Sequence, residues 1–372
     1  MKKTIINTFF YLILCFFVSN CQRNKDNEYF IGEIKYFDDS AKVVKNVTSK
    51  VIPHDLFHGI IAIHDSLILC FNPRLPNYFF QIFNLDTGEE LGYYCSKGQG
   101  PNDVISILNA HQLFKRGNDL FTIINDPYQR RSLFWNISKS IEQRKTVYDP
   151  IITYKQMNED KSIRYNFIYY QTEDTLLAEV RSISVSLEEA RTPSFEQLTM
   201  YNEDFVNNFP IYKRKTIRNR KKTKIPPDAF FDSSDMLKPD GTKMVQAMTN
   251  LPQINILDTH TGDVVGYRLK NSPDFSLFET DMQLMKFYYW DLKADDNYIY
   301  TSYMGKPPWD PRKDAFPFMN TIHIYDWNGK QLYELITDRA YARIWLDTVR
   351  NRLYTLDITD ELIYIDLNDL NL

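Results

Sequence analysis

The chain has 372 residues and carries 44 basic against 48 acidic residues, for a net charge of −4. Beyond the first 20 residues the balance is 42 to 48, and this mild acidity argues against nucleic acid as a partner. The length suits two domains or one large all-β domain, and the 25 Tyr and 25 Phe residues favour strands.

The first twenty residues have the features of an export signal. Lys2 and Lys3 form a basic start, an apolar stretch follows, and no acidic residue precedes Cys21. The apolar stretch is short for a membrane span. The residues VSNC that end at Cys21 resemble a lipobox, after which bacterial lipoprotein signal peptidase cleaves to leave a lipidated cysteine. An uncleaved N-terminal anchor is the alternative.

These features give three expected segments. Residues 1–20 are the signal peptide, 21–28 are the lipidated cysteine with a polar tether, and 29–372 form one domain. Two or three acyl chains would hold the protein firmly in a membrane. We therefore expect a lipoprotein of the cell envelope, anchored in the outer membrane and facing either the periplasm or the surface.

A repeat follows along the rest of the chain. Three stretches have alternating apolar residues, an Asn or Asp, a tight turn with Gly, and a second alternating run: 80–94, 254–269 and 322–336. Each predicts a β-hairpin. Weaker copies are 132–145, 198–212 and 362–372. The equivalent Asn or Asp positions are 84, 136, 202, 258, 326 and 366.

With the strands that precede each hairpin, the repeat becomes a four-stranded unit that occurs six times. This predicts an all-β fold, a six-bladed β-propeller with four-stranded antiparallel blades. The last unit ends after its third strand, so we expect 29–37 or 42–52 to supply the fourth strand and close the ring. A pair of β-sandwiches is the alternative fold.

The lipobox, the six irregular units and a GxGP motif at 98–101 resemble the TolB-like six-bladed propeller lipoproteins of bacteria. The resemblance extends over most of the mature chain. It implies the propeller fold and a location in the cell envelope, and it implies no assigned reaction.

The loops of the predicted units differ between the two faces of the ring. Connections from first to second and from third to fourth strands are short, whereas those on the other face are long and rich in Pro, Arg and aromatic residues. Long loops on a rigid scaffold commonly bind ligands. The candidate binding residues on this face are Arg74, Gly98, Gly100, Pro101, Asp126, Arg130, Arg131, Trp309 and Arg312.

Gly98 and Gly100 have two interpretations. They allow a turn through backbone angles closed to other residues, with Pro101 fixing the entry into the next strand. Alternatively, their exposed amides help to bind an anionic or carbonyl group.

No residue pattern predicts catalysis, a metal or a cofactor. His54, His58 and His64 enter a strand after Pro53, which disfavours shared metal binding from one helix face. We therefore expect a non-catalytic scaffold that binds an envelope protein or a glycan through the long-loop face. The alternative is a hydrolase or lactonase at the channel mouth, acting on a carbohydrate or lactone.

Cys70 and Cys95 remain in the mature domain besides Cys21. They fall in the second and fourth strands of the first unit, with one strand between them. The two strands would lie roughly 9–10 Å apart, beyond the reach of a disulfide. We therefore predict two free thiols.

Overall fold

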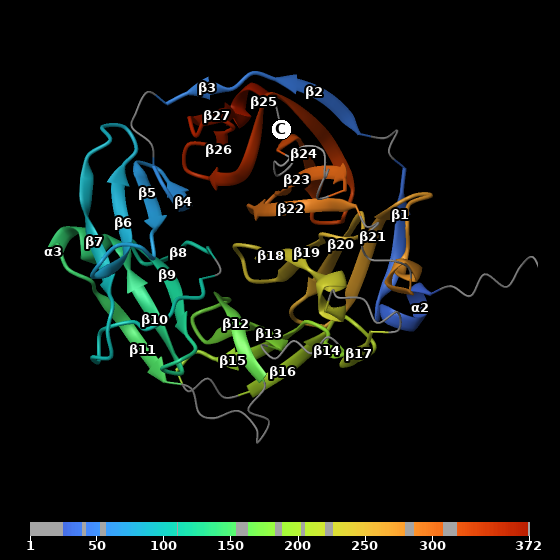
Figure 1. The fold of residues 1–372 in the computed structure, drawn as a ribbon, viewed down its shortest axis with the longest axis horizontal. Helices are drawn as coiled ribbons and strands as arrows, with labels where there is room; N and C mark the ends of the chain where they lie inside the picture. Colours follow the sequence, from blue (N-terminus) through green and yellow to red (C-terminus); the bar gives the residue numbers. More distant parts are fainter. Residues whose placement is uncertain are drawn as a thin grey trace, which may run out of the picture.

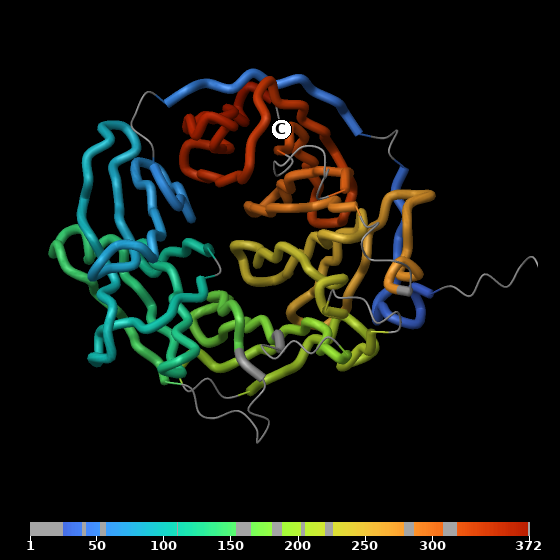
Figure 2. Tube along the Cα trace, viewed as in Figure 1, coloured from blue at the N-terminus to red at the C-terminus, as the bar shows by residue number. Residues whose placement is uncertain are grey.

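The computed structural model describes residues 25–38, 42–52, 57–109, 111–153, 163–182, 188–201, 205–219, 226–279, 286–307 and 318–370. At 163–164 and 181–182 only the backbone is described. Sheets stand around a central axis, and the chain passes from one sheet to the next around the ring (Figures 1 and 2). The fold is an all-β propeller. Within the described ranges, no helix is long and apolar enough to span a membrane.

Three sheets have a core of four antiparallel strands, as the sequence predicts. The first contains β4 (Ile60–His64), β5 (Leu67–Phe71), β6 (Tyr78–Asn84) and β7 (Glu90–Ser96). The second contains β8 (Phe114–Arg116), β9 (Asp119–Asp126), β10 (Arg131–Asn136) and β11 (Tyr148–Thr153). The third contains β12 (Ile163–Tyr170), β13 (Thr175–Ser182), β15 (Ser194–Thr199) and β16 (Phe205–Pro210), beside a small pair of β14 (Glu189–Arg191) and β17 (Thr216–Arg218).

The fourth sheet has five strands: β18 (Ser233–Leu237), β19 (Lys243–Met248), β20 (Gln253–Asp258), β21 (Val264–Leu269) and β1 (Glu33–Phe37). Short 3-10 helices η2 (Pro227–Phe231) and η3 (Phe275–Glu279) flank this sheet in the chain, and η5 (Leu367–Leu370) follows the last strand.

The remaining sheet has eight strands. They are β22 (Phe287–Ala294), β23 (Tyr298–Lys306), β24 (Met319–Asp326), β25 (Gln331–Asp347), β26 (Arg352–Asp357), β27 (Leu362–Asp366), β3 (Lys50–Val51) and β2 (Val43–Val47). The first half of β25 pairs with β24, and its second half pairs with β26. This one strand of 17 residues is therefore the outer strand of one four-stranded portion and the inner strand of the next.

The N-terminal segment runs along the outside of the ring (Figure 1). We call residues 25–38 and 42–52 the N-terminal belt. In it, β1 pairs in parallel with β21, β2 pairs in parallel with β25, and β3 pairs antiparallel with β27. Of the two segments predicted to complete the last unit, 42–52 supplies the strand, and 29–37 instead extends the fourth sheet.

The belt begins with a short helix, α2 (Asp26–Tyr29), which overlaps the end of the predicted tether over 21–28; residues 21–24 lie outside the described residues. Arg268 donates from Nη1 to both carboxylate oxygens of Asp26 at 2.8 Å, and both side chains are buried. Tyr29 and Phe30 are also buried, and both rings pack on Phe275. The residues around Asp26 are polar and suggest a solvent-exposed tether. The contact with Arg268 could not be predicted from them, because Arg268 is distant in the sequence.

Four of the six repeated Asn or Asp residues end a strand in the same way, while Asn202 lies outside the described residues. Asn84 Oδ1 accepts hydrogen bonds from the backbone amides of residues 86 and 87, and Asp258 Oδ1 accepts them from residues 260 and 261. Asp326 and Asp366 do the same for the amides that follow them. An Asn or Asp side chain that accepts a hydrogen bond from the backbone amide two residues later favours a turn. At these four positions the sequence pattern therefore predicted the turn correctly.

Position 136 shows where the hairpin prediction over 132–145 is wrong. Asn136 Oδ1 accepts a hydrogen bond from the Lys139 amide at 2.9 Å and so caps a helix, α3 (Ile137–Gln143). The chain then returns as β11. An Asn followed by a polar turn is also a helix N-cap signal, and here that preference prevails.

The ring is held together by apolar side chains between neighbouring sheets. Phe80 of the first sheet contacts Trp135 of the second, with ring centroids 4.9 Å apart. Ile68 and Tyr354 belong to one buried cluster that joins the first sheet to the last. Cys70 in β5 and Cys95 in β7 are buried free thiols separated by β6, which confirms the prediction made for them.

Candidate binding surfaces

Three loops on the long-loop face form one surface, which we call the corner platform: residues 72–77, 96–103 and 126–131. Lys97 Nζ donates to the Pro73 carbonyl at 2.7 Å and also contacts the Leu75 carbonyl. Gln129 Nε2 donates to the Gly98 carbonyl at 3.2 Å. Side chains of one loop thus bond the backbone of the next, and the three loops are fixed relative to one another.

Gly98 and Gly100 are needed for close packing and not for unusual backbone angles. Neither has a positive φ. A Cβ on Gly98 would lie 2.5 Å from Asp103 Oδ2, and one on Gly100 would lie 2.7 Å from it. The Gly100 amide donates to that carboxylate at 3.1 Å, and the Gly98 amide donates to the Val104 carbonyl at 3.2 Å. The prediction that these two glycines adopt backbone angles closed to other residues is therefore wrong. The backbone amides of Gly98 and Gly100 both donate hydrogen bonds within the protein.

Two of the predicted charged residues are buried supports of the platform. Arg131 Nη1 donates to the Pro101 carbonyl at 2.5 Å, and Nη2 contacts the Asp103 carbonyl. Asp126 is fully buried and accepts hydrogen bonds from the amides of Ile105 and Tyr128, at 2.9 and 3.2 Å. These contacts hold the shape of the surface.

Arg74 and Arg130 stand exposed on the same platform. In the part of the chain that the structure describes, no carboxylate pairs with either guanidinium. Tyr128 belongs to the same loop as Arg130, and its side chain is 68% exposed. Seven of the nine predicted binding residues are thus brought together, while Trp309 and Arg312, like Cys21, lie outside the described residues.

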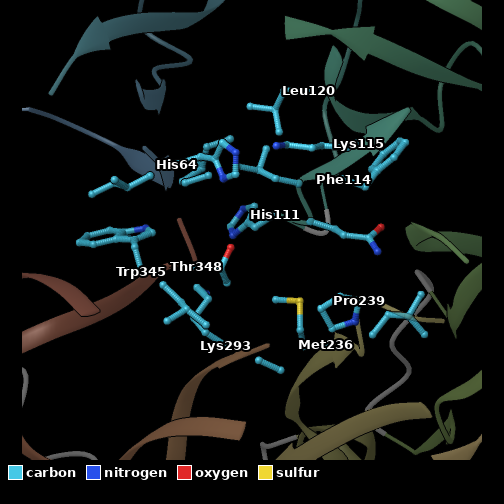
Figure 3. Close-up of a pocket in the computed structure, with 18 of the residues that line it drawn as sticks. His64, His111, Phe114, Lys115, Leu120, Met236, Pro239, Lys293, Trp345 and Thr348 are labelled. Carbon is cyan, nitrogen blue, oxygen red and sulfur yellow. The ribbon is translucent and has the colours of Figure 1, made fainter. Parts of the chain in front are cut away.

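The central channel holds a second candidate site, at the opposite ends of the strands. A cavity of about 360 Å³, which we call the turn-end cavity, lies where the inner strands reach their short turns. Figure 3 shows His64, Lys115, Lys293 and Trp345 around it. The inner strands of every sheet contribute to its wall, through residues on β4, β8, β12, β18, β22 and β25.

A smaller loop-end cavity of about 230 Å³ adjoins it in the channel. It shares His111, Met236 and Lys293 with the turn-end cavity, so the two meet at these side chains. Asp291 and Arg343 line the loop-end cavity. Asp291 accepts a hydrogen bond from Lys293 Nζ at 3.0 Å and another from the Ile344 amide at 3.0 Å.

Burial favours the neutral form of two histidines in the channel. Burial lowers the pKa of His111 to about 4, and the charge of nearby Lys293 adds to this effect. Burial also lowers the pKa of His64, against the opposing effect of Asp347. His111 further has a left-handed φ of 57°, which is uncommon for a residue with a side chain.

The sequence-based candidates did not include His111, Lys115 or Lys293. The available signal was their position near the ends of predicted inner strands, where side chains can face the channel. Their separation in the chain concealed that they share one cavity. Among the described residues, no group of three or more His, Cys, Asp or Glu side chains could hold a metal ion.

No known protein family and no curated protein matches the sequence. Among solved structures, the chain is similar to a member of the DUF4221 family from Bacteroides vulgatus, with 10% identity and a TM-score of 0.50 over 91% of this chain and 97% of that one. A protein of Bacteroides fragilis, provisionally described as exported, has 14% identity and a TM-score of 0.45 over 92% and 96%. The calcium-binding protein regucalcin of Agrobacterium tumefaciens has 10% identity and a TM-score of 0.45 over 87% and 95%. The similarity to the DUF4221 member concerns the fold alone.

Proposed function

We propose that this chain is an exported lipoprotein, anchored through Cys21 in the outer membrane, whose propeller binds an envelope protein or a glycan without performing chemistry. The observation that carries the proposal is the corner platform. Its loops are fixed by internal hydrogen bonds, and two arginines without a carboxylate partner among the described residues project from them. Arg and Tyr on a rigid surface are typical of binding hot spots.

The charge of the platform indicates the kind of partner. Its cations are Arg74, Lys97, Arg130 and Arg131, and its carboxylates are Asp103 and Asp126. The surface therefore has a net charge of +2, although the whole chain is acidic. An acidic patch on a protein, or a glycan with acid groups, complements this surface.

We propose that the ring has six blades. The eight-stranded sheet is taken as two units that share β25, and the last of these is completed by β3. Together with the lipobox ending at Cys21, this count supports the resemblance to TolB-like lipoproteins. Palmitate labelling tests the anchor: Cys21→Ala should abolish incorporation and release the protein from membranes, and unchanged labelling would refute the lipoprotein assignment.

The binding proposal is tested with a charge-reversed platform. Membranes from cells that carry the wild-type protein, Arg74→Glu/Arg130→Glu, or the control Lys330→Glu are cross-linked, and the captured molecules are quantified. Lys330 is exposed at a turn of the opposite face. We expect the double variant to lose at least 80% of a specific partner, as a rough figure for two hot-spot residues, and the control to keep it. Equal capture by all three proteins would refute the platform as the binding surface.

The hydrolase or lactonase remains the alternative hypothesis. Turnover of a sugar or lactone by the wild-type protein, with equal capture by the three proteins, would favour it.

A further inference from the structure

The turn-end cavity has the size and position of a small-molecule site, separate from the corner platform. Its volume of about 360 Å³ has room for roughly a dozen water-sized groups. Inner strands from around the ring supply most of its wall, and connecting segments supply the rest, among them the segment that carries His111 before β8. Rigid, partly apolar cavities of this size commonly bind small ligands.

The lining of this cavity is rich in nitrogen and contains no Asp or Glu. Its basic side chains are His64, His111, Lys115 and Lys293. Lys293 is bonded to Asp291, as described above. For the other three, no described residue supplies a hydrogen bond or ion pair to the side chain. Lys115 is exposed and both histidines are half-buried, so these side chains are accessible to a molecule that enters the cavity.

The three side chains lie close enough to act on one ligand. Figure 3 shows the Lys115 side chain reaching toward His64, with His111 in the space between them and Lys293. The charge of Lys115 acts on His64, and the charges of Lys293 and Arg343 act on His111. Asp347 and Asp291 act in the opposite direction, and burial is the largest cause of both lowered pKa values. A bound negative charge would pair with Lys115 and would stabilise the charged form of either imidazole.

His111 is the least ordinary member of the set. Its backbone has φ of 57°, and its amide donates to Asn109 Oδ1 at 2.7 Å, which holds the chain in this conformation. A left-handed backbone at a residue with a side chain is a strained conformation that often marks a functional position. Here the strain places an imidazole where both channel cavities meet.

The rest of the wall is apolar. Phe114, Leu120, Met236 and Trp345 line the same cavity. Apolar surface of this extent gives no favourable contact to an inorganic anion, whose hydration shell it would have to remove. It favours a ligand that carries a hydrocarbon or aromatic body beside its charge.

We propose that the turn-end cavity binds a small organic carboxylate with an apolar body, with the carboxylate held by Lys115, His64 and His111 and the body packed on Phe114, Met236 and Trp345. This site is independent of the partner surface proposed above. Ligand binding here would leave the corner platform free on the opposite face of the ring.

The proposal predicts that the affinity of the cavity for a carboxylate depends on pH. The carboxylate stabilises the charged form of an imidazole, so binding raises the pKa of His64 and His111 and takes up protons. His111 faces Asp291, Lys293 and Arg343, and His64 faces Asp65, Lys115 and Asp347. The affinity should therefore increase as the pH falls from 7.5 to 5.5.

Isothermal titration of the mature full chain with 3-phenylpropanoate and its neutral isostere 3-phenylpropanamide tests the proposal. We expect the carboxylate to bind at least tenfold more tightly than the amide. Lys115→Gln should weaken carboxylate binding at least fivefold and leave amide binding unchanged. The control Lys330→Gln, at an exposed turn, should change neither, and His64→Gln provides a second variant if Lys115→Gln fails to fold.

Several results would overturn the proposal. They are equal affinity for the acid and the amide, unchanged carboxylate affinity in both cavity variants, tighter binding of inorganic phosphate than of the carboxylate, and no heat of binding with the folded wild-type protein. Zn²⁺ binding that is lost in His64→Gln and His111→Gln, with no carboxylate binding, would assign the cavity to a metal and also refute it.

Discussion

Asp26 and Arg268 form a buried ion pair that joins the N-terminal helix to β21 of the fourth sheet. Arg268 Nε also donates to Gln253 Oε1 at 2.7 Å, and the Phe275 amide donates to Asp26 at 3.3 Å. The Asp26 carboxylate thus accepts hydrogen bonds from both β21 and η3. A buried charge that loses its partner is strongly destabilising, whereas an exposed pair contributes little.

We expect Asp26→Asn to lower the free energy of unfolding by about 3–5 kcal/mol, because Arg268 keeps its charge in a buried site. Chemical denaturation measures this. The matched control is Glu28→Gln, whose carboxylate pairs with Arg214 at 2.6 Å near the surface and should cost about 0–1 kcal/mol. Equal effects of the two substitutions would show that the pair does not hold the belt in place.

Removal of the belt tests closure of the ring. A chain that lacks residues 22–52 loses β3 from the last sheet, β2 from β25 and β1 from β21, together with the buried Tyr29, Phe30 and Val47. It should unfold at a clearly lower temperature and aggregate through its bare strand edges. A control that lacks only residues 22–24 should melt like the full mature chain. Coincident melting of all three proteins would refute the structural role of the belt.

Gly98→Ala should destabilise the corner platform, because the new methyl group meets the Asp103 carboxylate. We expect a loss of roughly 1–3 kcal/mol in unfolding free energy, as for other overpacked sites. In an Asp103→Ala background the same substitution should cost much less, and the double-mutant cycle isolates this contact. Additive losses would mean that the glycine is needed for another reason.

The two cysteines should be unreactive in the native protein. Burial raises the pKa of Cys70 to about 12, and burial likewise raises the pKa of Cys95. Thiolate is the reactive form, so labelling should stay slow up to pH 9. Denatured, unreduced protein should label at both positions when its peptides are mapped. Failure to label there would mean a disulfide and a different order of strands in the first sheet.

Acid should weaken the contact between the belt and β25. A hydrogen bond from His323 and the contact with Lys42 lower the pKa of Glu334 to about 2. A carboxylate with a depressed pKa stabilises the fold above its unfolded pKa, near 4.5, and this stability is lost as the pH falls toward 2. Glu334→Gln should therefore reduce stability at pH 7 and flatten the decline between pH 5 and 2.

Urea unfolding at several pH values measures this effect. Glu89→Gln, at an exposed carboxylate, is the control and should leave the decline unchanged. A decline of the same slope in Glu334→Gln and in the wild type would show that another group causes the acid sensitivity.

The strand pairs with an Asn or Asp before the turn, such as those at Asn84, Asp258 and Asp326, could be predicted because every interaction involved is local. The helix after Asn136 was missed because one residue type serves as both a turn acceptor and an N-cap. The docking of Asp26 was also missed, since its partner Arg268 is 242 residues away.

The two candidate sites also differ in how far the sequence alone could predict them. The corner platform could be predicted in outline, because its long loops and its Arg residues are visible in the sequence. The channel cavity could not, because His64, Lys115 and Lys293 come from different sheets and meet only when the ring closes. Single basic residues at strand ends carry no signal that they converge.

The route of the belt determines how the ring would respond to a mechanical load. A pull on the N-terminus reaches α2 and the Asp26–Arg268 pair first, then β1, then β2, and only last β3, which seals the circle at β27. The contacts of α2, β1 and β2 have to break before the force reaches the pairing of β3 with β27. A force that enters at that end would thus be dissipated on the outer rim, and the closure of the ring would be the last contact to feel it.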